Sequence, residues 1–299
     1  FRSVITDTAG NSTTGTASNT QLTVDQTAPT VTEVTAVTTP GNDNTPTVLL
    51  GSSEVGSISS TLAIDLTSVQ ANNSNSATFD ALSDGSYTPT VTVTDTAGNA
   101  TSLQLTTFVI DTAAPSISAI TTSAFSWGEI LNATEDDSNG TVTVTTSGVE
   151  DGRTVTIVLN GVTDTGTVSS NSATITIAAS DLQDLNDTSY TLTANVSDAS
   201  GNPAAEVTSS SFTVDTVNPT VTIASTTVST GTSSNDQSIA VTFTTSETTS
   251  NFAAEDVSVS NGTLSSFAGS GTDYTATFTP DEDGATTIAV GSPKFTDAA

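Results

Sequence analysis

Several short stretches of the chain alternate between apolar and polar residues with a period of two. In each stretch apolar side chains share one face and Thr side chains occupy most of the other. The clearest examples are Thr90–Thr94, Thr141–Thr145, Thr154–Ile157, Ala173–Ile177 and Tyr274–Phe278. This pattern is typical of antiparallel strands that have one face in a core and the other in solvent. The sequence therefore predicts an all-β fold.

Two short sequence patterns recur along the chain. The first, Asp-x-Ala/Ser-Gly-Asn, occupies residues 7–11, 95–99 and 198–202, and a shortened copy begins at Asp297. The second begins with Val or Ile followed by Asp and ends in Pro, at residues 24–29, 110–115 and 214–219. Its aspartates are separated by 86 residues (Asp25 to Asp111) and 104 residues (Asp111 to Asp215). This spacing fits one Ig-like sandwich per repeat and exceeds that of a solenoid unit.

The repeats predict tandem immunoglobulin-like antiparallel β-sandwich domains arranged end to end. We expect the C-terminal strands of a truncated Ig-like domain at 1–28, Ig-like domains at 29–113 and 114–217, and a nearly complete one at 218–299. The Gly of the first pattern suits the positive φ of a hairpin turn. The Pro of the second cannot donate to a strand ladder and marks the joint between domains. With an opening in mid-pattern and no signal peptide, we expect a piece of a longer protein.

The net charge and the lack of a long apolar run limit the partners that we expect for the chain. The chain has 32 acidic residues against three basic ones (Arg2, Arg153, Lys294), which gives a formal net charge of −29. Nucleic acid and anionic membranes are bound through Lys and Arg, so neither is an expected partner. No apolar run approaches the roughly 20 residues of a membrane span, so membrane insertion is not expected.

The sequence lacks several residue types and motifs on which enzymatic catalysis usually depends. Cys, His and Met are absent, which excludes disulfide, thiolate and imidazole chemistry, and the sequence has no Gly-rich phosphate loop. Paired carboxylates can hydrolyse glycosides in principle. Here, however, the carboxylates recur in every repeat, and catalytic pairs are not usually copied into each domain. We expect no catalytic residues and no organic cofactor.

Together, the two patterns resemble bacterial Ig-like repeats of giant secreted adhesins, including RTX adhesins and biofilm-associated proteins. Segments Ser126–Asp137 and Gly161–Thr167 are similar to one subtype, and Phe252–Val257 with Gly262–Phe267 to a second. The resemblance implies an extracellular stalk on the bacterial cell surface, with Ca²⁺ near the domain junctions. The Gly-Gly-x-Gly-x-Asp nonapeptide of RTX proteins does not occur in the sequence.

Acidic residues recur at positions that Ig topology brings to one end of each sandwich: the entry linker, the B–C loop and the F–G loop. The three successive sets are Asp25, Glu54 and Asp95; Asp111, Glu150, Asp151 and Asp198; and Asp215, Glu247 and Asp297. Two carboxylates about 4 Å apart repel by roughly 1–4 kcal/mol. Because Ca²⁺ takes oxygen ligands of this kind, we predict that each set binds Ca²⁺. The alternative is that each Asp only caps its own turn.

Four further acidic clusters fall on loops that we predict at the opposite end of the domains. These are residues 42–44, residues 135–137, Asp184 with Asp187, and residues 281–283. They either complete a junction site from the neighbouring domain or are ordinary solvated loops.

Three aromatic residues have a structural and a binding interpretation. Tyr87 and Tyr190 each stand eight residues before the Asp of a first-pattern copy, where a tyrosine corner of an Ig-like sandwich belongs. Trp127, the only Trp, fits core or loop packing better than sugar stacking.

Three functions remain open from the sequence. The leading one is a structural stalk whose partners are neighbouring repeats of the same chain and cell-surface or matrix components. In the second, outward Thr-rich faces bind carbohydrate or ice. In the third, the domains self-assemble into a surface layer or filament through an exposed strand.

Overall fold

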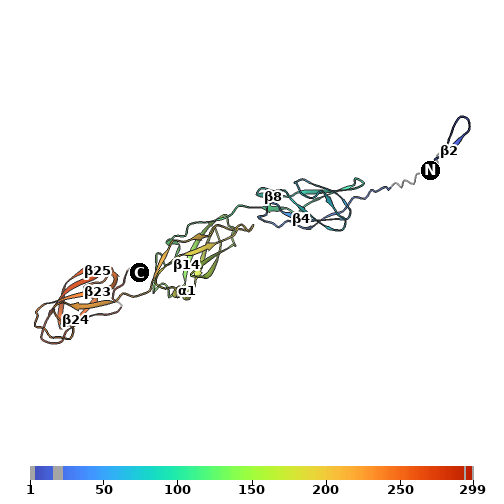
Figure 1. Ribbon diagram of the computed structural model, residues 1–299. Helices are drawn as coiled ribbons and strands as arrows, with labels where there is room; N and C mark the ends of the chain where they lie inside the picture. The colour runs from blue at the N-terminus through green and yellow to red at the C-terminus, as the bar shows by residue number, and fades with distance from the viewer. Residues whose placement is uncertain (1–3, 16–22, 293, 298–299) are drawn as a thin grey trace. The chain divides into compact units, whose positions relative to one another are not determined.

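The computed structural model describes residues 4–15, 23–292 and 294–297 and confirms the all-β prediction (Figure 1). Within these residues one short α-helix, α1 (Ala179–Gln183), and two 3-10 turns, Thr122–Ala124 and Ala254–Asp256, are the helical elements. None of the described helices has the length and apolar character that a bilayer crossing requires.

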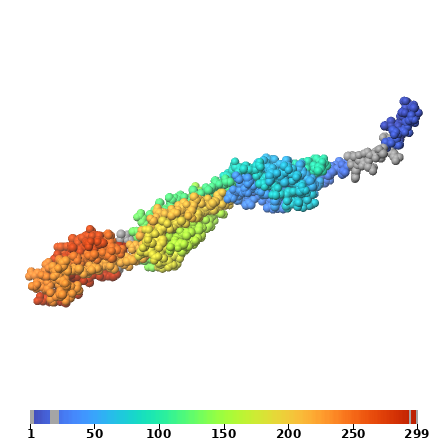
Figure 2. Space-filling view, viewed as in Figure 1, coloured from blue at the N-terminus to red at the C-terminus, as the bar shows by residue number. Residues whose placement is uncertain are grey.

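Contacts along the backbone divide the chain into two compact units. One comprises Phe1–Ala113 with Ala199–Asn202, and the other Ala114–Asp198 with Pro203–Ala299. Three separate hydrophobic cores lie within them. We call the surrounding strands sandwich one (β3–β11), sandwich two (β12–β21) and sandwich three (β22–β26), and each presents a continuous packed surface in Figure 2. The predicted domain boundaries and end-to-end arrangement stay predictions.

The predicted truncated domain at 1–28 is described only in part. Its described residues form a hairpin of β1 (Val4–Thr6) and β2 (Ser12–Thr14). The remainder of this prediction at residues 1–3 and 16–22 lies outside the described residues.

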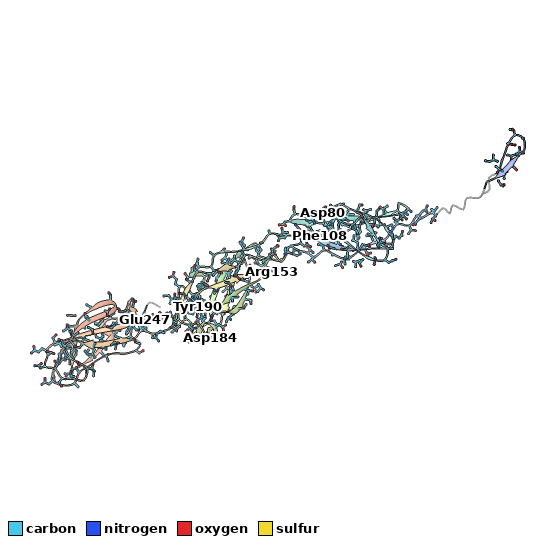
Figure 3. All side chains as sticks on the ribbon, viewed as in Figure 1. Asp80, Phe108, Arg153, Asp184, Tyr190 and Glu247 are labelled. Atoms are coloured by element: carbon cyan, nitrogen blue, oxygen red, sulfur yellow. The ribbon has the colours of Figure 1, made fainter. Side chains whose placement is uncertain are left out.

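Sandwich one packs a three-stranded sheet, β3-β4-β7, against a four-stranded sheet, β10-β9-β5-β6, and the pair β11-β8 completes it. Its core includes Phe79 and Phe108, whose ring centroids are 5.5 Å apart. Figure 3 shows Phe108 inside this sandwich. The strands are β3 (Val31–Thr35), β4 (Thr47–Ser52), β5 (Gly56–Ser60), β6 (Ser68–Val69), β7 (Ser74–Thr78), β8 (Gly85–Tyr87), β9 (Thr90–Asp95), β10 (Ala100–Gln104) and β11 (Phe108–Ile110).

Sandwich two contains sheets β12-β14-β17, β16-β15-β19-β20 and β13-β21-β18. Its strands are β12 (Ser116–Ile117), β13 (Ile130–Asn132), β14 (Gly140–Ser147), β15 (Thr154–Leu159), β16 (Val162–Thr167), β17 (Ser172–Ile177), β18 (Ser189–Tyr190), β19 (Leu192–Asn195), β20 (Val207–Thr208) and β21 (Phe212–Asp215).

The last strand of sandwich two, β21, pairs in parallel with β13, and Leu131 lies opposite Val214. Sandwich one has a single parallel bridge, Gly41 to Ile110, in the corresponding place. In sandwich two, Trp127 is buried and stacks on Phe125 with ring centroids 5.2 Å apart. Trp127 is therefore a core residue.

Sandwich three has sheets β22-β23-β25 and β24-β26. Its strands are β22 (Val221–Ser225), β23 (Ile239–Thr249), β24 (Val257–Ser260), β25 (Gly262–Pro280) and β26 (Thr287–Val290). The long segment β25 folds back on itself, because Ser265 Oγ donates to Thr277 O and Thr275 Oγ1 to Ala268 O. Phe252 anchors an aromatic core, with four ring neighbours at centroid distances of 4.8–5.7 Å.

The alternation along β11 predicts opposite outcomes for two neighbouring substitutions. Phe108 is 1% exposed and Val109 is 37% exposed. Phe108→Ala should destabilise sandwich one by about 3–5 kcal/mol, because it removes a buried ring and leaves a cavity. Val109→Ala should cost under about 1 kcal/mol, as expected for a surface position. Chemical denaturation of both variants measures the difference, and equal losses would contradict the assigned inward face of β11.

Candidate metal centres

The first-pattern turn is held by its own aspartate. Asp95 Oδ1 accepts hydrogen bonds from the N–H groups of Ala97 (2.8 Å) and Asn99 (2.9 Å). Asn99 Nδ2 donates to Asp95 Oδ2 at 2.9 Å, and Gly98 has a φ of 96°. The Asn99 side-chain bond is the main cause that lowers the pKa of Asp95, and the turn N–H groups lower it further. Asp95 is thus ionised at neutral pH and caps its turn.

The same turn also holds the segment that precedes its sandwich. Asn99 Nδ2 donates to the main-chain oxygen of Asp25 at 3.2 Å. In the next copy, Asn202 Nδ2 donates to the main-chain oxygen of Asp111 at 2.8 Å, and Ser200 Oγ to Asp111 Oδ2 at 3.3 Å. The Asn of the first pattern therefore fixes the position of the Asp of the second pattern.

A second set of aspartates holds the residue after each linker Asp. Asp84 Oδ1 accepts from Thr112 N–H (2.9 Å) and Oγ1 (2.8 Å). Asp187 Oδ1 accepts from Thr216 N–H (3.0 Å) and Oγ1 (2.9 Å). The sequence interpretation missed Asp84 and placed Asp187 only in a weak cluster. The signal that would have found both is an Asp three residues before each corner Tyr.

Both predicted tyrosine corners make the expected kind of hydrogen bond. Tyr87 OH donates to Ser83 O at 2.7 Å, and Tyr190 OH accepts from Asn186 N–H at 3.0 Å. Each ring also packs on a core Phe, Phe108 or Phe212. These tyrosines fix the loops that contain Asp84 and Asp187.

Two of the predicted sets come together as compact triads. In triad one, Asp25, Glu54 and Asp95 each offer a carboxylate oxygen, and these oxygens lie within 4.8 Å of one another. In triad two, Asp215, Glu247 and Asp297 do the same. Each triad joins the segment before a sandwich to two places within it.

The expectation that Glu247 lies in a loop is wrong. Strand β23 continues to Thr249 and includes Glu247, which Figure 3 labels. The pairing of β23 with β25 shifts register between Thr244 and Thr249. Glu247 therefore lies in the irregular end of a long strand, where the ladder is interrupted.

Triad one has carboxylate lone pairs that are available for a cation. Asp25 Oδ1 accepts one hydrogen bond, from Thr27 N–H at 3.0 Å, and Oδ2 accepts none from a described residue. The Glu54 carboxylate likewise accepts none in the part of the chain that is described. The three oxygen donors suit a hard cation such as Ca²⁺, which takes six to eight oxygens in flexible geometry.

Triad two is electrostatically unfavourable when all three groups are charged. Burial raises the pKa of Glu247, and the charges of Asp215 and Asp297 raise it further, with a smaller effect from Asp187. Asp187 thus belongs to the surroundings of triad two. A divalent cation at this position would reverse the repulsion.

The third predicted set is divided between the two compact units. Asp111 belongs to one unit, whereas Glu150, Asp151 and Asp198 belong to the other. Asp111 Oδ1 accepts from Ala113 N–H at 3.1 Å, and Asp151 Oδ1 from Ser170 N–H at 2.7 Å. Ca²⁺ binding by this set stays a prediction.

Two stretches of the chain match sequence families, each described as a bacterial Ig-like domain. One covers residues 32–112 and the other residues 215–299. They correspond to sandwich one and to sandwich three with its preceding linker. No curated protein sequence matches the chain.

Several solved structures are similar. A Ca²⁺-stabilised adhesin that helps an Antarctic bacterium reach out and bind ice is 24% identical, with a match that covers 99% of this chain and 80% of that one (TM-score 0.39). A 1.5-MDa bacterial ice-binding adhesin is 29% identical over 72% of this chain and 73% of that one (TM-score 0.37). An immunoglobulin-like domain of the M. primoryensis ice-binding adhesin is 32% identical over 34% of this chain and 95% of that one (TM-score 0.25).

The raised pKa of Glu247 predicts the pH dependence of the metal-free protein. Since the folded state holds this proton more tightly than the unfolded state, stability should rise as the pH falls from neutral towards the ordinary Glu value of 4.5. In chelator at pH 7, Glu247→Gln should raise the melting temperature of sandwich three by about 1–4 °C, because it removes the repulsion. Glu255→Gln in the same sandwich is the charge-matched control and should change little. A lower melting temperature for Glu247→Gln in chelator would contradict the repulsion.

Proposed function

We propose that this chain, in which residues 32–112 and 215–299 match bacterial Ig-like domains, is a structural extender, or stalk, of a large secreted bacterial surface adhesin. In this proposal Ca²⁺ at the inter-domain junctions makes the stalk rigid. The stalk is not an enzyme, and its nearest partners are neighbouring repeats of the same chain. It acts outside the cell, at the bacterial surface.

The observation that carries the proposal is the composition of the two triads. Each contains one carboxylate from the segment before a sandwich and two from the sandwich itself, with oxygens within 4.8 Å of one another. A single Ca²⁺ bound to all three would connect the linker to the sandwich at several points. Backbone carbonyls and waters would supply the remaining ligands, since three carboxylates alone fall short of the usual six to eight oxygens when each is monodentate.

Hydrogen bonds also fix the linkers, so that their aspartates are held in position before an ion binds. Asn99 donates to the backbone of Asp25, and Thr112, next to Asp111, donates to Asp84. Because these bonds already restrict the linker, less conformational freedom is lost when a cation binds. The sequence-based prediction that Asp111, Glu150, Asp151 and Asp198 bind Ca²⁺ stays part of this proposal because the acidic pattern recurs.

Binding of Ca²⁺ only to the folded protein should add stability that grows with free Ca²⁺, about 2.7 kcal/mol at 100 times Kd. We expect Ca²⁺ to raise the melting temperature of sandwich one. Glu54→Gln and Asp95→Asn should each reduce that Ca²⁺-dependent rise, because each removes one charged ligand of triad one. Differential scanning calorimetry with Ca²⁺ and with chelator measures both effects.

Glu33→Gln is the matched control for this experiment. Glu33 lies in β3 and accepts hydrogen bonds from Thr106, and a Gln amide oxygen can still accept them. This variant loses the same charge but should keep the full Ca²⁺ response. If Glu33→Gln and Glu54→Gln lose the response equally, or if wild type shows none, triad one is not a Ca²⁺ site.

The stiffening itself should be visible in solution scattering. Ca²⁺ should narrow the distribution of particle shapes, whereas chelator should broaden it. Replacing Asp111 and Asp198 by Ala should loosen only the junction near residue 113 and leave triads one and two responsive. A scattering curve that chelator leaves unchanged would refute Ca²⁺-dependent rigidity, even if Ca²⁺ binds.

A further inference from the structure

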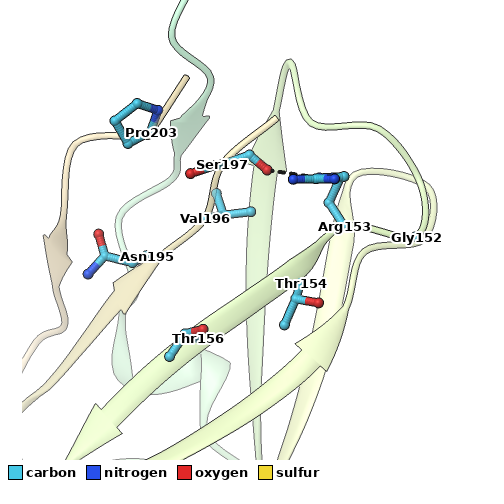
Figure 4. A pocket seen from close by; sticks show the side chains of 8 residues that line it. All are labelled: Gly152, Arg153, Thr154, Thr156, Asn195, Val196, Ser197 and Pro203. Carbon is cyan, nitrogen blue, oxygen red and sulfur yellow. Dashed lines mark hydrogen bonds between the residues drawn. The ribbon is translucent and has the colours of Figure 1, made fainter. Parts of the chain in front are cut away.

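A shallow hollow of about 350 Å³ lies on sandwich two, between the start of β15 and the end of β19 (Figure 4). The residues that matter for its chemistry are Arg153, Thr154, Thr156, Asn195, Val196 and Pro203. All of them belong to the same compact unit. The hollow contributes nothing to either carboxylate triad.

Arg153 is notable because, in so acidic a chain, it forms no ion pair with any residue that the structure describes. Its Nε donates to the main-chain oxygen of Ser197 at 3.3 Å, as the dashed line in Figure 4 shows. No carboxylate of the described residues pairs with it, although Glu150 and Asp151 are close in sequence. The half-buried guanidinium has five N–H donors, so four stay available at the wall of the hollow.

The other walls combine hydrogen-bonding groups with apolar surface. The hydroxyls of Thr154 and Thr156 have no hydrogen bond to another described residue. Asn195 Nδ2 donates to Glu206 Oε2 at 2.8 Å, which leaves the amide oxygen of Asn195 as an acceptor. Pro203 supplies exposed apolar atoms, whereas Val196 is 5% exposed and belongs to the core of sandwich two. The hollow thus offers the guanidinium group of Arg153, two Thr hydroxyls, the amide oxygen of Asn195 as an acceptor, and apolar atoms.

From this combination we infer that the hollow binds one uronic acid residue, a sugar ring that bears a carboxylate. The guanidinium fork matches a carboxylate in two parallel hydrogen bonds. The sugar hydroxyls pair with Thr154, Thr156 and Asn195, and the ring lies on the apolar atoms of Pro203. The volume is at the lower end of small-molecule sites, which suits a single ring.

The surrounding charge favours a singly charged ligand over a phosphate or sulfate cluster. Glu206 lies beside the hollow through its bond to Asn195, and the chain has a net charge of −29. Multiply charged anions are repelled more strongly than a lone carboxylate. With one ion pair and a few hydrogen bonds, we expect a Kd of roughly 1 mM for the free monosaccharide.

The test is a titration of the whole, isotope-labelled, Ca²⁺-saturated chain with glucuronate, followed by NMR. Saturable shifts should appear at the backbone amides of Thr154, Thr156 and Ser197. Glucose, which lacks the carboxylate, should leave them unchanged at the same concentration. Shifts confined to the two carboxylate triads, or to Glu150, Asp151 and Asp198, would instead report glucuronate on bound Ca²⁺ and would overturn the inference.

Three variants decide whether Arg153 is the recognising group. Arg153→Gln should weaken glucuronate binding by at least about tenfold, as expected for loss of a charged hydrogen-bonded pair. Arg153→Lys should weaken it less, since the charge stays but the fork is lost. Lys294→Gln makes the same change in net charge on sandwich three and should bind normally.

Unchanged affinity in Arg153→Gln, or equal responses to glucose and glucuronate, would overturn the inference. If Arg153→Gln fails to fold, the affinity of Arg153→Lys relative to Lys294→Gln still decides. The stalk proposal does not depend on this site, because its readouts are Ca²⁺-dependent melting and scattering.

Discussion

The carboxylate of Asp95 is the interaction on which the geometry of sandwich one's junction end depends. A carboxylate offers about four lone-pair sites. Two on Oδ1 receive the N–H groups of Ala97 and Asn99, and one on Oδ2 receives the Asn99 amide. One site on Oδ2 remains for a cation. Turn capping and metal ligation are therefore compatible in one residue, and the turn that Asp95 builds also positions Asp25 through Asn99.

The two triads hold their negative charge in different ways. In triad one, donors from the turn surround Asp95 and lower its pKa, so part of the charge is neutralised by the fold itself. In triad two, burial and the neighbouring aspartates raise the pKa of Glu247. The same ligand types thus form two different sites. Hydrogen bonds stabilise the charge of triad one when no metal ion is bound, whereas repulsion between its carboxylates destabilises metal-free triad two. A cation relieves more repulsion at the second.

Much of this arrangement could be predicted from the sequence, because it repeats. Alternation identified the strands, and the loop positions of an Ig-like topology identified Glu54 and Glu247 as partners of remote aspartates. Asp84 was not predicted, because its partner Thr112 lies 28 positions away in the sequence, and the one recurring signal is an Asp three residues before each corner Tyr. The reversal inside β25 depends on positive φ at Gly269 and Gly271, which the alternating pattern around them does not reveal.

The parallel pairing of β13 with β21 has a mechanical consequence for a chain under tension. A pull on the chain before β13 and after β21 draws two parallel strands in opposite directions. The hydrogen bonds around Leu131 and Val214 then share the load in shear and must break together instead of opening one at a time. Resistance to forced unfolding is governed by the unfolding rate rather than by equilibrium stability. This short sheet therefore acts as a clamp that slows the extension of sandwich two under load.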